Sequence, residues 1–161
     1  MKKIFIIGIV ASGKTTLAKR LSKHVQIPWY ELDCIVHYQS NNGRVKRTQQ
    51  EQFDVIKDID RQGHWIFEGT DRESYQCLYE MADTIIFLDT PLWKRRLRIV
   101  TRYLKQQLRL EKAHYKSDFR MLKMMFKWTD DFERNRGCFE AKINLYKDKV
   151  IRITDNKILN F

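Results

Sequence analysis

Cysteine, proline and glycine are all scarce in this sequence of 161 residues. Only two prolines and six glycines are present, which excludes collagen-like and Pro/Gly-rich low-complexity chains. The three cysteines, Cys34, Cys77 and Cys138, are odd in number and far apart. Neither a disulfide framework nor a zinc site is therefore expected. We expect reduced thiols and a cytoplasmic location.

Long apolar runs are also absent. No segment approaches the ~18 continuous apolar residues of a membrane helix, so no membrane partner is predicted. Lys2-Lys3 and the apolar residues after them resemble a secretory signal, but the run leads directly into Gly13-Lys14-Thr15 without a cleavage site. It is better interpreted as a buried strand. Without repeats or Pro/Ser-rich linkers, the length predicts one domain over residues 1–161.

Acidic residues are scarce in only one part of the chain. The formal net charge is +11, and basic and acidic residues balance over residues 1–91, whereas residues 92–136 carry +9 and residues 137–161 carry +2. A positive block of this kind predicts a polyanionic ligand. Nucleotide phosphates, nucleic acid and an acidic surface all remain candidates.

The first 91 residues alternate between apolar runs of strand length and helical spacing. The runs lie at 3–7, 29–32, 65–67 and 84–88, and another follows at 150–153. This alternation predicts an α/β fold, with a parallel sheet covered by helices on both faces. The turn signal Ser40-Asn41-Asn42-Gly43 predicts a hairpin or exposed loop within residues 35–47.

Long helices are predicted after Pro91. In the first of them, an apolar face lies beside a basic stripe. The face is formed by Trp93, Leu97, Val100, Leu104 and Leu108, and the stripe by Arg98, Arg102, Lys105 and Arg109. A second helix is expected from a Ser117 cap to Trp128, and a third from about 129 to 146. The aromatic residues of this region are expected in the helix core; they are Trp93, Phe119, Phe126 and Trp128.

A glycine-rich loop carries the strongest motif. Residues 8–15, Gly-Ile-Val-Ala-Ser-Gly-Lys-Thr, satisfy G-x-x-x-x-G-K-[ST] between a predicted strand and helix. Backbone N–H groups and a helix N-terminus would surround a phosphate there. The expected nucleotide contacts are Gly8, Ala11, Ser12, Gly13, Lys14, Thr15 and Thr16. Lys14 would reach the β- and γ-phosphates of ATP, Thr16 the α-phosphate, and the Thr15 hydroxyl would bind Mg²⁺.

Three acidic residues follow predicted strands, where this architecture places its chemistry. Asp33, Glu68 and Asp89 are these candidates. Each could assist Mg²⁺, orient an acceptor or accept its proton. Gly69 permits close backbone approach beside Glu68. Asp89 could equally cap the helix after Pro91.

These segments together resemble the small bacterial topology modulation proteins (FlaR-like) of the adenylate kinase-like P-loop group. The resemblance is carried by "GIVASGKTTLAKRL", "WYELD", "WIFEGT", "TIIFLDTPLWKRRLRIVTRYL" and "KVIRIT". It implies a P-loop NTPase fold with strand order 2-3-1-4-5 and a helical lid over residues 92–136. It also implies that Arg98 and Arg102 reach the transferring phosphoryl group, that Arg134 and Arg136 lie on the returning side of the lid, and that residues 154–157 contact the base.

The sequence departs from that family at the acceptor side. Glu68 and Thr70 stand where relatives have aspartate and asparagine, and Leu92 replaces a frequent arginine. The leading hypothesis is an ATP-dependent phosphotransferase, with catalytic residues Lys14, Arg98, Arg102, Asp33 and Glu68. Arg44, Lys46 and Arg47 favour an anionic acceptor. The alternative is an NTP-binding regulator associated with DNA, although no DNA- or RNA-binding signature is present.

Overall fold

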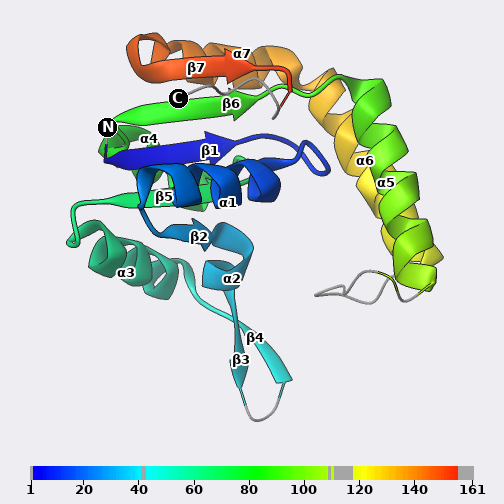
Figure 1. The fold of residues 1–161 in the computed structure, drawn as a ribbon, viewed down its shortest axis with the longest axis horizontal. Helices are drawn as coiled ribbons and strands as arrows, with labels where there is room; N and C mark the ends of the chain where they lie inside the picture. Colours follow the sequence, from blue (N-terminus) through cyan, green and yellow to red (C-terminus); the bar gives the residue numbers. More distant parts are fainter. Residues whose placement is uncertain (1, 41–42, 109, 111–117, 156–161) are drawn as a thin grey trace.

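A five-stranded parallel sheet forms the centre of the fold (Figure 1). The computed structural model describes residues 2–40, 43–108, 110 and 118–155. The strands are β1 (Lys3–Ile7), β2 (Trp29–Glu31), β5 (Trp65–Gly69), β6 (Thr84–Leu88) and β7 (Val150–Ile153). Their spatial order is β2-β5-β1-β6-β7, and every neighbouring pair is parallel. This is the predicted 2-3-1-4-5 order, counted over the strands of this sheet.

Alternate side chains of β1 enter two separate cores because successive residues of a strand point to opposite faces. Ile4 and Ile6 pack with Leu17 and Leu21 of α1 (Lys14–Val25). Phe5 and Ile7 belong to the larger core on the other face. That core also receives side chains from α3 (Gln49–Asp60), α4 (Gln76–Met81) and α7 (Arg136–Asn144). Helices therefore cover both faces, as predicted for a parallel sheet with continuous apolar strands.

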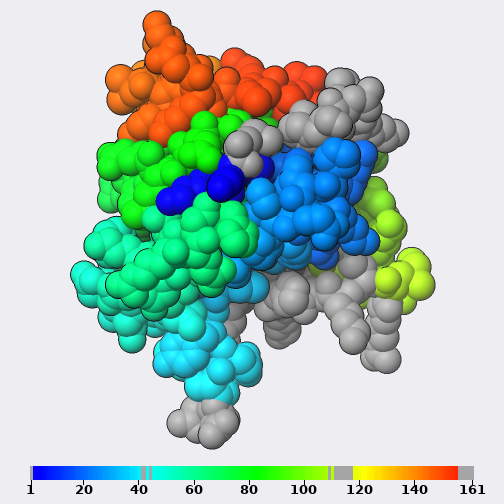
Figure 2. Space-filling model, turned by 60° about the vertical axis from the view of Figure 1, so that its left-hand side comes forward, coloured from blue at the N-terminus to red at the C-terminus, as the bar shows by residue number. Residues whose placement is uncertain are grey.

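A short hairpin projects from the body of the molecule (Figures 1 and 2). It follows α2 (Leu32–Val36) and pairs β3 (His37–Ser40) with β4 (Gly43–Lys46) in antiparallel register. The Arg47 guanidinium donates to the carbonyls of Cys34 and Ile35 and lies over the Tyr38 ring. Arg47 thus fixes the hairpin to α2, while the Arg44 side chain lies outside the described part of the chain. A capping box between Thr48 and Glu51 then starts α3.

The remaining helices lie beyond the carboxyl ends of the strands (Figure 1). They are α5 (Leu92–Gln107) and α6 (Phe119–Arg134), which pack against each other; α7 follows α6 in the chain and lies over the sheet. Among the described residues, two 3-10 helices, η1 (Glu73–Tyr75) and η2 (Lys147–Lys149), complete the connections. None of the helices described is long and apolar enough to cross a membrane.

Two predictions about these helices are wrong. The second helix continues through Thr129 to Arg134, because the Thr129 hydroxyl donates to the Phe126 carbonyl and Thr129 is buried within the helix. Asp118, whose carboxylate accepts from the Met121 amide, caps this helix. The predicted cap Ser117 and the stripe residue Arg109 lie outside the described residues.

The second error concerns the aromatic residues expected in the helix core. Trp93, Phe119 and Trp128 are 63%, 59% and 40% exposed. The buried residues of α5 are instead Arg95 and Ile99. Ion pairs from Arg95 and Arg96 to α6 set the side of α5 that packs. A buried arginine therefore occupies the place expected for the apolar face.

Candidate active site

The glycine-rich loop joins β1 to α1 in a conformation that requires its glycines. A Cβ atom on Gly8 would lie 2.8 Å from Ser12 Oγ and 2.9 Å from the Leu88 carbonyl oxygen. Gly13, directly before α1, has φ of 101°, in the left-handed region that favours glycine. Ala11 also has positive φ, 58°. This strained turn brings backbone groups and the α1 N-terminus together, as a phosphate loop requires.

Lys14 and Thr15 begin α1 at this loop. The Lys14 ammonium donates to the Ile9 carbonyl oxygen at 3.0 Å, so the side chain folds back over the loop. The Thr15 hydroxyl donates to Glu68 Oε1 at 2.6 Å. Thr16, the next residue, is exposed. The structure therefore joins the loop to the end of β5 through one hydroxyl–carboxylate contact.

At this contact, the pKa shifts favour the neutral forms of both Glu68 and Lys14. Burial raises the pKa of Glu68, and the nearby Lys14 charge and the Thr15 hydrogen bond only partly counteract it. Burial also lowers the pKa of Lys14, against the attraction of Glu68 and Asp33, while the Arg102 charge lowers it further. Both groups have thus lost more hydration than their partners replace. Shifted pKa values cluster at functional sites.

Two further carboxylates lie near Lys14. Glu31 ends β2 opposite Glu68 in the strand register, and its charge acts on both Lys14 and Glu68. Asp33 is exposed and forms an ion pair with Arg72 at 3.1 Å. Of the three predicted acids, Glu68 is thus the one in direct contact with the loop, whereas Asp33 acts on Lys14 through its charge.

The side chains of Arg98 and Thr90 bind backbone carbonyl groups of the loop. Arg98 donates to the carbonyl oxygens of Ser12 at 2.5 Å and Ala11 at 3.3 Å. The buried Thr90 hydroxyl also donates to Ser12 O, at 2.9 Å. Arg102 lines a small gap between α5 and α6 and is close enough for its charge to act on Lys14. The structure thus brings Arg98 and Arg102 to the loop from one face of α5.

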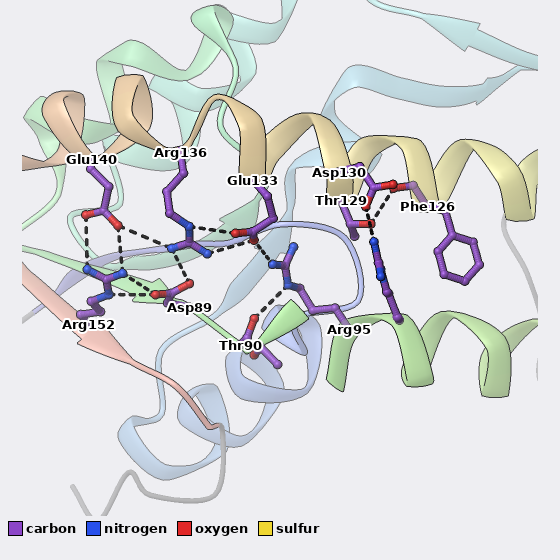
Figure 3. A network of polar contacts seen from close by, with 11 residues as sticks. Asp89, Thr90, Arg95, Phe126, Thr129, Asp130, Glu133, Arg136, Glu140 and Arg152 are labelled. Atoms are coloured by element: carbon purple, nitrogen blue, oxygen red, sulfur yellow. Dashed lines mark hydrogen bonds and ion pairs between the residues drawn. The ribbon is translucent and has the colours of Figure 1, made fainter. Parts of the chain in front are cut away.

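Asp89 is not a cap and belongs to a different cluster (Figure 3). Its carboxylate forms ion pairs with Arg136 at 3.0 Å and Arg152 at 2.5 Å. α5 has Pro91 as its N-cap residue, without a side-chain cap. Arg136 also binds Glu133, while Arg134 is an exposed residue paired with Asp131. Asp89 and Arg136 therefore satisfy each other's charge across β6 and α7.

A cavity of about 330 Å³ opens beside the first residues of the loop. Its lining comes from the loop, the end of β5 and the helices α6 and α7: Gly8, Ile9, Thr70, Asp71, Phe132, Asn135, Cys138, Phe139 and Lys142. Asp71 accepts from Lys142 at 2.7 Å and from the Tyr79 hydroxyl at 2.6 Å. The volume of the cavity lies in the range of small-molecule sites.

The oxygen atoms at the loop fit a magnesium ion. Thr15 Oγ1 and Glu68 Oε1 lie 2.6 Å apart, and oxygen ligands with water and phosphate are what Mg²⁺ uses in nucleotide sites. Among the residues described, no group of three or more His, Cys, Asp or Glu side chains could hold a metal by itself. A metal here would therefore depend on a nucleotide for part of its coordination.

Four residues of this region were not identified as candidates from the sequence. Glu31 was detectable, because it ends the strand that pairs with β5. Arg72 and Thr90 lie in connections and follow no motif. Arg95 was hidden among six basic residues of α5, although only Arg95 is fully buried among those residues.

Comparison with known proteins agrees with this fold. The AAA domain family model matches residues 4–118. A shikimate kinase of Flavobacterium psychrophilum is 26% identical over 106 residues, which are 65% of this chain and 60% of that protein. The chain thus matches less than two thirds of that relative's length.

Solved structures show the same architecture. A protein of Eubacterium ventriosum has a TM-score of 0.55 at 16% identity, covering 95% of this chain and 90% of that one. Shikimate kinase of Aquifex aeolicus has a TM-score of 0.50 at 18% identity, covering 97% and 88%. These likenesses concern the fold alone. The family match spans more than half of the sequence and includes the glycine-rich loop, so the chain belongs to the AAA domain family of P-loop NTPases.

Proposed function

We propose that this protein is an ATP-dependent kinase that transfers the γ-phosphoryl group to a small molecule. The observation that carries the proposal is the contact between Thr15 and Glu68 beside Lys14, at a glycine-rich loop of P-loop form. The likeness to a shikimate kinase in sequence supports the same class. Within it, we propose an adenylate kinase-like arrangement related to topology modulation proteins. Residues 1–161 would form one kinase domain with residues 92–136 as its lid.

The residues of the loop would neutralise and orient the phosphates. Lys14 would exchange its bond to the Ile9 carbonyl for the β- and γ-phosphates of ATP. Thr15 and Glu68 would hold Mg²⁺, which when bound reduces the negative charge on the phosphates. Arg102 would neutralise charge that develops on the transferring phosphoryl group. Arg98 would assist this neutralisation from its position beside the loop carbonyl groups. Closure of α5 and α6 would exclude water.

We place the acceptor in the cavity beside Gly8 and Ile9. Its wall offers a hydroxyl from Thr70, a carboxylate from Asp71 and the Lys142 ammonium. A small hydroxylated anion fits this set, because Lys142 could pair with the anionic group and Asp71 could accept from a hydroxyl. Because Glu68 would serve the metal, Asp33, whose charge acts on Lys14, would orient the acceptor hydroxyl or accept its proton.

The test is a coupled assay of ADP release with Mg-ATP. The panel contains hydroxy acids, nucleoside monophosphates and nucleosides, with Lys14→Ala measured alongside. Turnover on hydroxy acids that disappears in the variant supports the proposal. Turnover on nucleoside monophosphates alone retains the kinase but rejects the hydroxyl acceptor. ATP binding without turnover on any class rejects the kinase.

The alternative is an NTP-binding regulator that associates with DNA. Exposed basic residues on α5 and α6 favour it, among them Lys105, Arg120, Lys123 and Lys127. Several other basic residues of the region are engaged in ion pairs with acidic residues, as Arg95, Arg96 and Arg136 are. DNA affinity would fall steeply as salt rises, whereas ATP turnover would persist. Strong DNA binding at physiological salt without phosphotransfer would establish this alternative.

A further inference from the structure

The outer face of α5 carries a continuous apolar stripe. Its members are Trp93, Leu97, Val100, Leu104 and Leu108, with exposed fractions of 63%, 60%, 39%, 54% and 68%. Their spacing of four, three, four and four residues places them on one side of the helix. At 1.5 Å per residue the stripe is about 22 Å long. Large exposed apolar patches of this kind mark interaction surfaces.

This stripe, which we call the α5 stripe, faces away from the candidate active site. Arg98 leaves α5 on another side and binds the loop carbonyls. Arg95 and Ile99, the buried residues of α5, face the interior. Arg96 pairs with Asp130 on the side where α6 packs. Within the described chain, these contacts occupy the other sides of α5 and leave the stripe exposed, apart from the residues that contact the loop.

The shape of the stripe favours a helix as its partner. The steps of four, three and four residues from Trp93 to Leu104 have the a/d spacing of a coiled-coil seam, in which side chains of one helix fit between those of another, and Leu108 extends the same side by one turn. The seam occupies a narrow part of the helix surface. Helices that lie in a lipid surface bury a broader apolar face. The α5 stripe therefore matches a second helix better than a membrane.

The charges beside the stripe define that helix further. Lys94 and Arg96 flank Trp93 and Leu97. Lys123 and Lys127 lie seven and three residues before Asp130, and so share the side of α6 that meets Arg96. The acidic residues Asp130 and Asp155 pair with Arg96 and Lys94. Lys105, Lys123 and Lys127 add further positive charge, so the border of the stripe is basic.

A basic border disfavours a second copy of the same helix. Two α5 helices paired along their stripes would bring the exposed Lys105, Lys123 and Lys127 of one copy near the same residues of the other. Like charges at such flanking positions repel, and complementary charges select the partner. The fitting partner is thus a helix with acidic flanks.

We propose that the α5 stripe binds an amphipathic helix of another protein, with an apolar seam flanked by glutamate or aspartate. The proposal does not depend on the kinase function, because the stripe and the candidate active site lie on different sides of α5. It adds a protein partner to a nucleotide-binding domain.

The experiment measures binding of the whole protein to synthetic helical peptides by calorimetry. One peptide carries leucine at the a and d positions and glutamate at e and g over four heptads, and its match carries lysine at e and g. Like charges at e and g keep each peptide from pairing with itself. We expect micromolar affinity for the glutamate peptide, at least about tenfold weaker binding of the lysine peptide, and weaker glutamate binding at high salt.

Variants locate the binding surface. Leu97→Asp and Leu104→Asp are each expected to weaken binding of the glutamate peptide at least about tenfold. Leu145→Asp is the matched control, because Leu145 is 79% exposed and lies after α7, outside the stripe. Unchanged ATP affinity and thermal midpoint in all three variants would show that the loss arises at the surface.

Several results would overturn the proposal. Absence of binding, or equal binding of the two peptides, would reject an acidic helix as the partner. A concentration-dependent dimer that Leu97→Asp abolishes in sedimentation would show that a second copy covers the stripe. Binding to phosphatidylserine vesicles but not to the peptide would assign the stripe to a lipid surface.

Discussion

Two clusters of charged residues lie on opposite sides of the glycine-rich loop, and the pKa values of their carboxyl groups shift in opposite directions. At the loop, burial dominates, so that the pKa of Glu68 is raised and that of Lys14 is lowered. Around Asp89, burial acts to raise the carboxyl pKa, but hydrogen bonds from Arg152 and Arg136 outweigh it and the pKa is lowered. We call these the loop cluster and the Asp89 cluster.

The difference separates a binding site from a structural network. In the loop cluster the charges lack full compensation within the protein, as expected of groups that await a charged ligand. In the Asp89 cluster each charge has several partners: Arg136 contacts Asp89 and Glu133, and Arg152 contacts Asp89 and Glu140 (Figure 3). Perturbed carboxylates after strands can therefore serve either role, and here the two differ in how far other groups of the protein compensate their charge.

The largest expected effect is on the loop cluster. Lys14→Ala should lower phosphoryl transfer by about 10³-fold or more, because Lys14 contributes positive charge where phosphate charge develops. The thermal midpoint should stay within about 3 °C of wild type, since burial already disfavours the Lys14 charge. Steady-state kinetics and calorimetry measure the two quantities. Lys23→Ala, on an exposed position of the same helix, is the control; an unfolded Lys14→Ala protein would contradict the assignment.

The buried Arg95 provides a test on the structural side. Its guanidinium donates to the Thr90 carbonyl at 2.8 Å and pairs with Glu133. Arg95→Met should lower the free energy of unfolding by about 3 kcal/mol, because it removes the buried partner of an ion pair and leaves the Thr90 carbonyl without this donor. Chemical denaturation measures this value. Arg96→Met, which removes the exposed ion pair with Asp130, should lower the free energy of unfolding by under about 1 kcal/mol. Similar losses in the two variants would show that burial of Arg95 does not increase its contribution to stability.

Glu68→Gln is expected to affect function without reducing stability. Turnover should fall about 10²-fold, while the free energy of unfolding at pH 7 should be equal or higher. The folded pKa of Glu68 lies above its unfolded value. Wild type should therefore gain stability as pH falls through the folded pKa, and the variant should lack this gain. Denaturation between pH 4 and pH 8 would check both statements.

Asp89→Asn is expected to show the opposite pH behaviour. The free energy of unfolding of the variant should be about 2 kcal/mol lower at pH 7, because Arg136 and Arg152 lose a shared charged acceptor. Because the folded pKa of Asp89 is lowered, its contribution is present above the unfolded pKa of about 3.9 and is lost as pH falls through the folded value. The stabilities of wild type and variant should therefore converge at low pH in urea titrations.

Arg102→Ala should have the smallest effect of the series. Turnover should fall about tenfold with little change in ATP affinity, because Arg102 would meet charge that develops during transfer. Transient kinetics and equilibrium binding of ATP separate the two effects. Equal losses in turnover and affinity would show that Arg102 binds ground-state phosphate.

Much of the fold could be predicted from the sequence because its signals are local. The apolar runs of β1, β5 and β6, and the motif of residues 8–15, each define an element within a few neighbouring residues. The loop residues Lys14 and Thr15 were predicted for the same reason. The boundaries of α6 were predicted less well, since Thr129 is compatible with either a helix end or a helix interior.

The sequence by itself determined the strand–loop–helix unit and the alternation that makes a parallel sheet. Only the tertiary structure decided which carboxylate joins the loop, since Glu68 lies 53 residues from Thr15 in the chain and meets it through strand pairing. It also decided the exposure of the α5 stripe. An amphipathic pattern shows that a helix has two faces, but which face is buried depends on the ion pairs and neighbours that packing supplies.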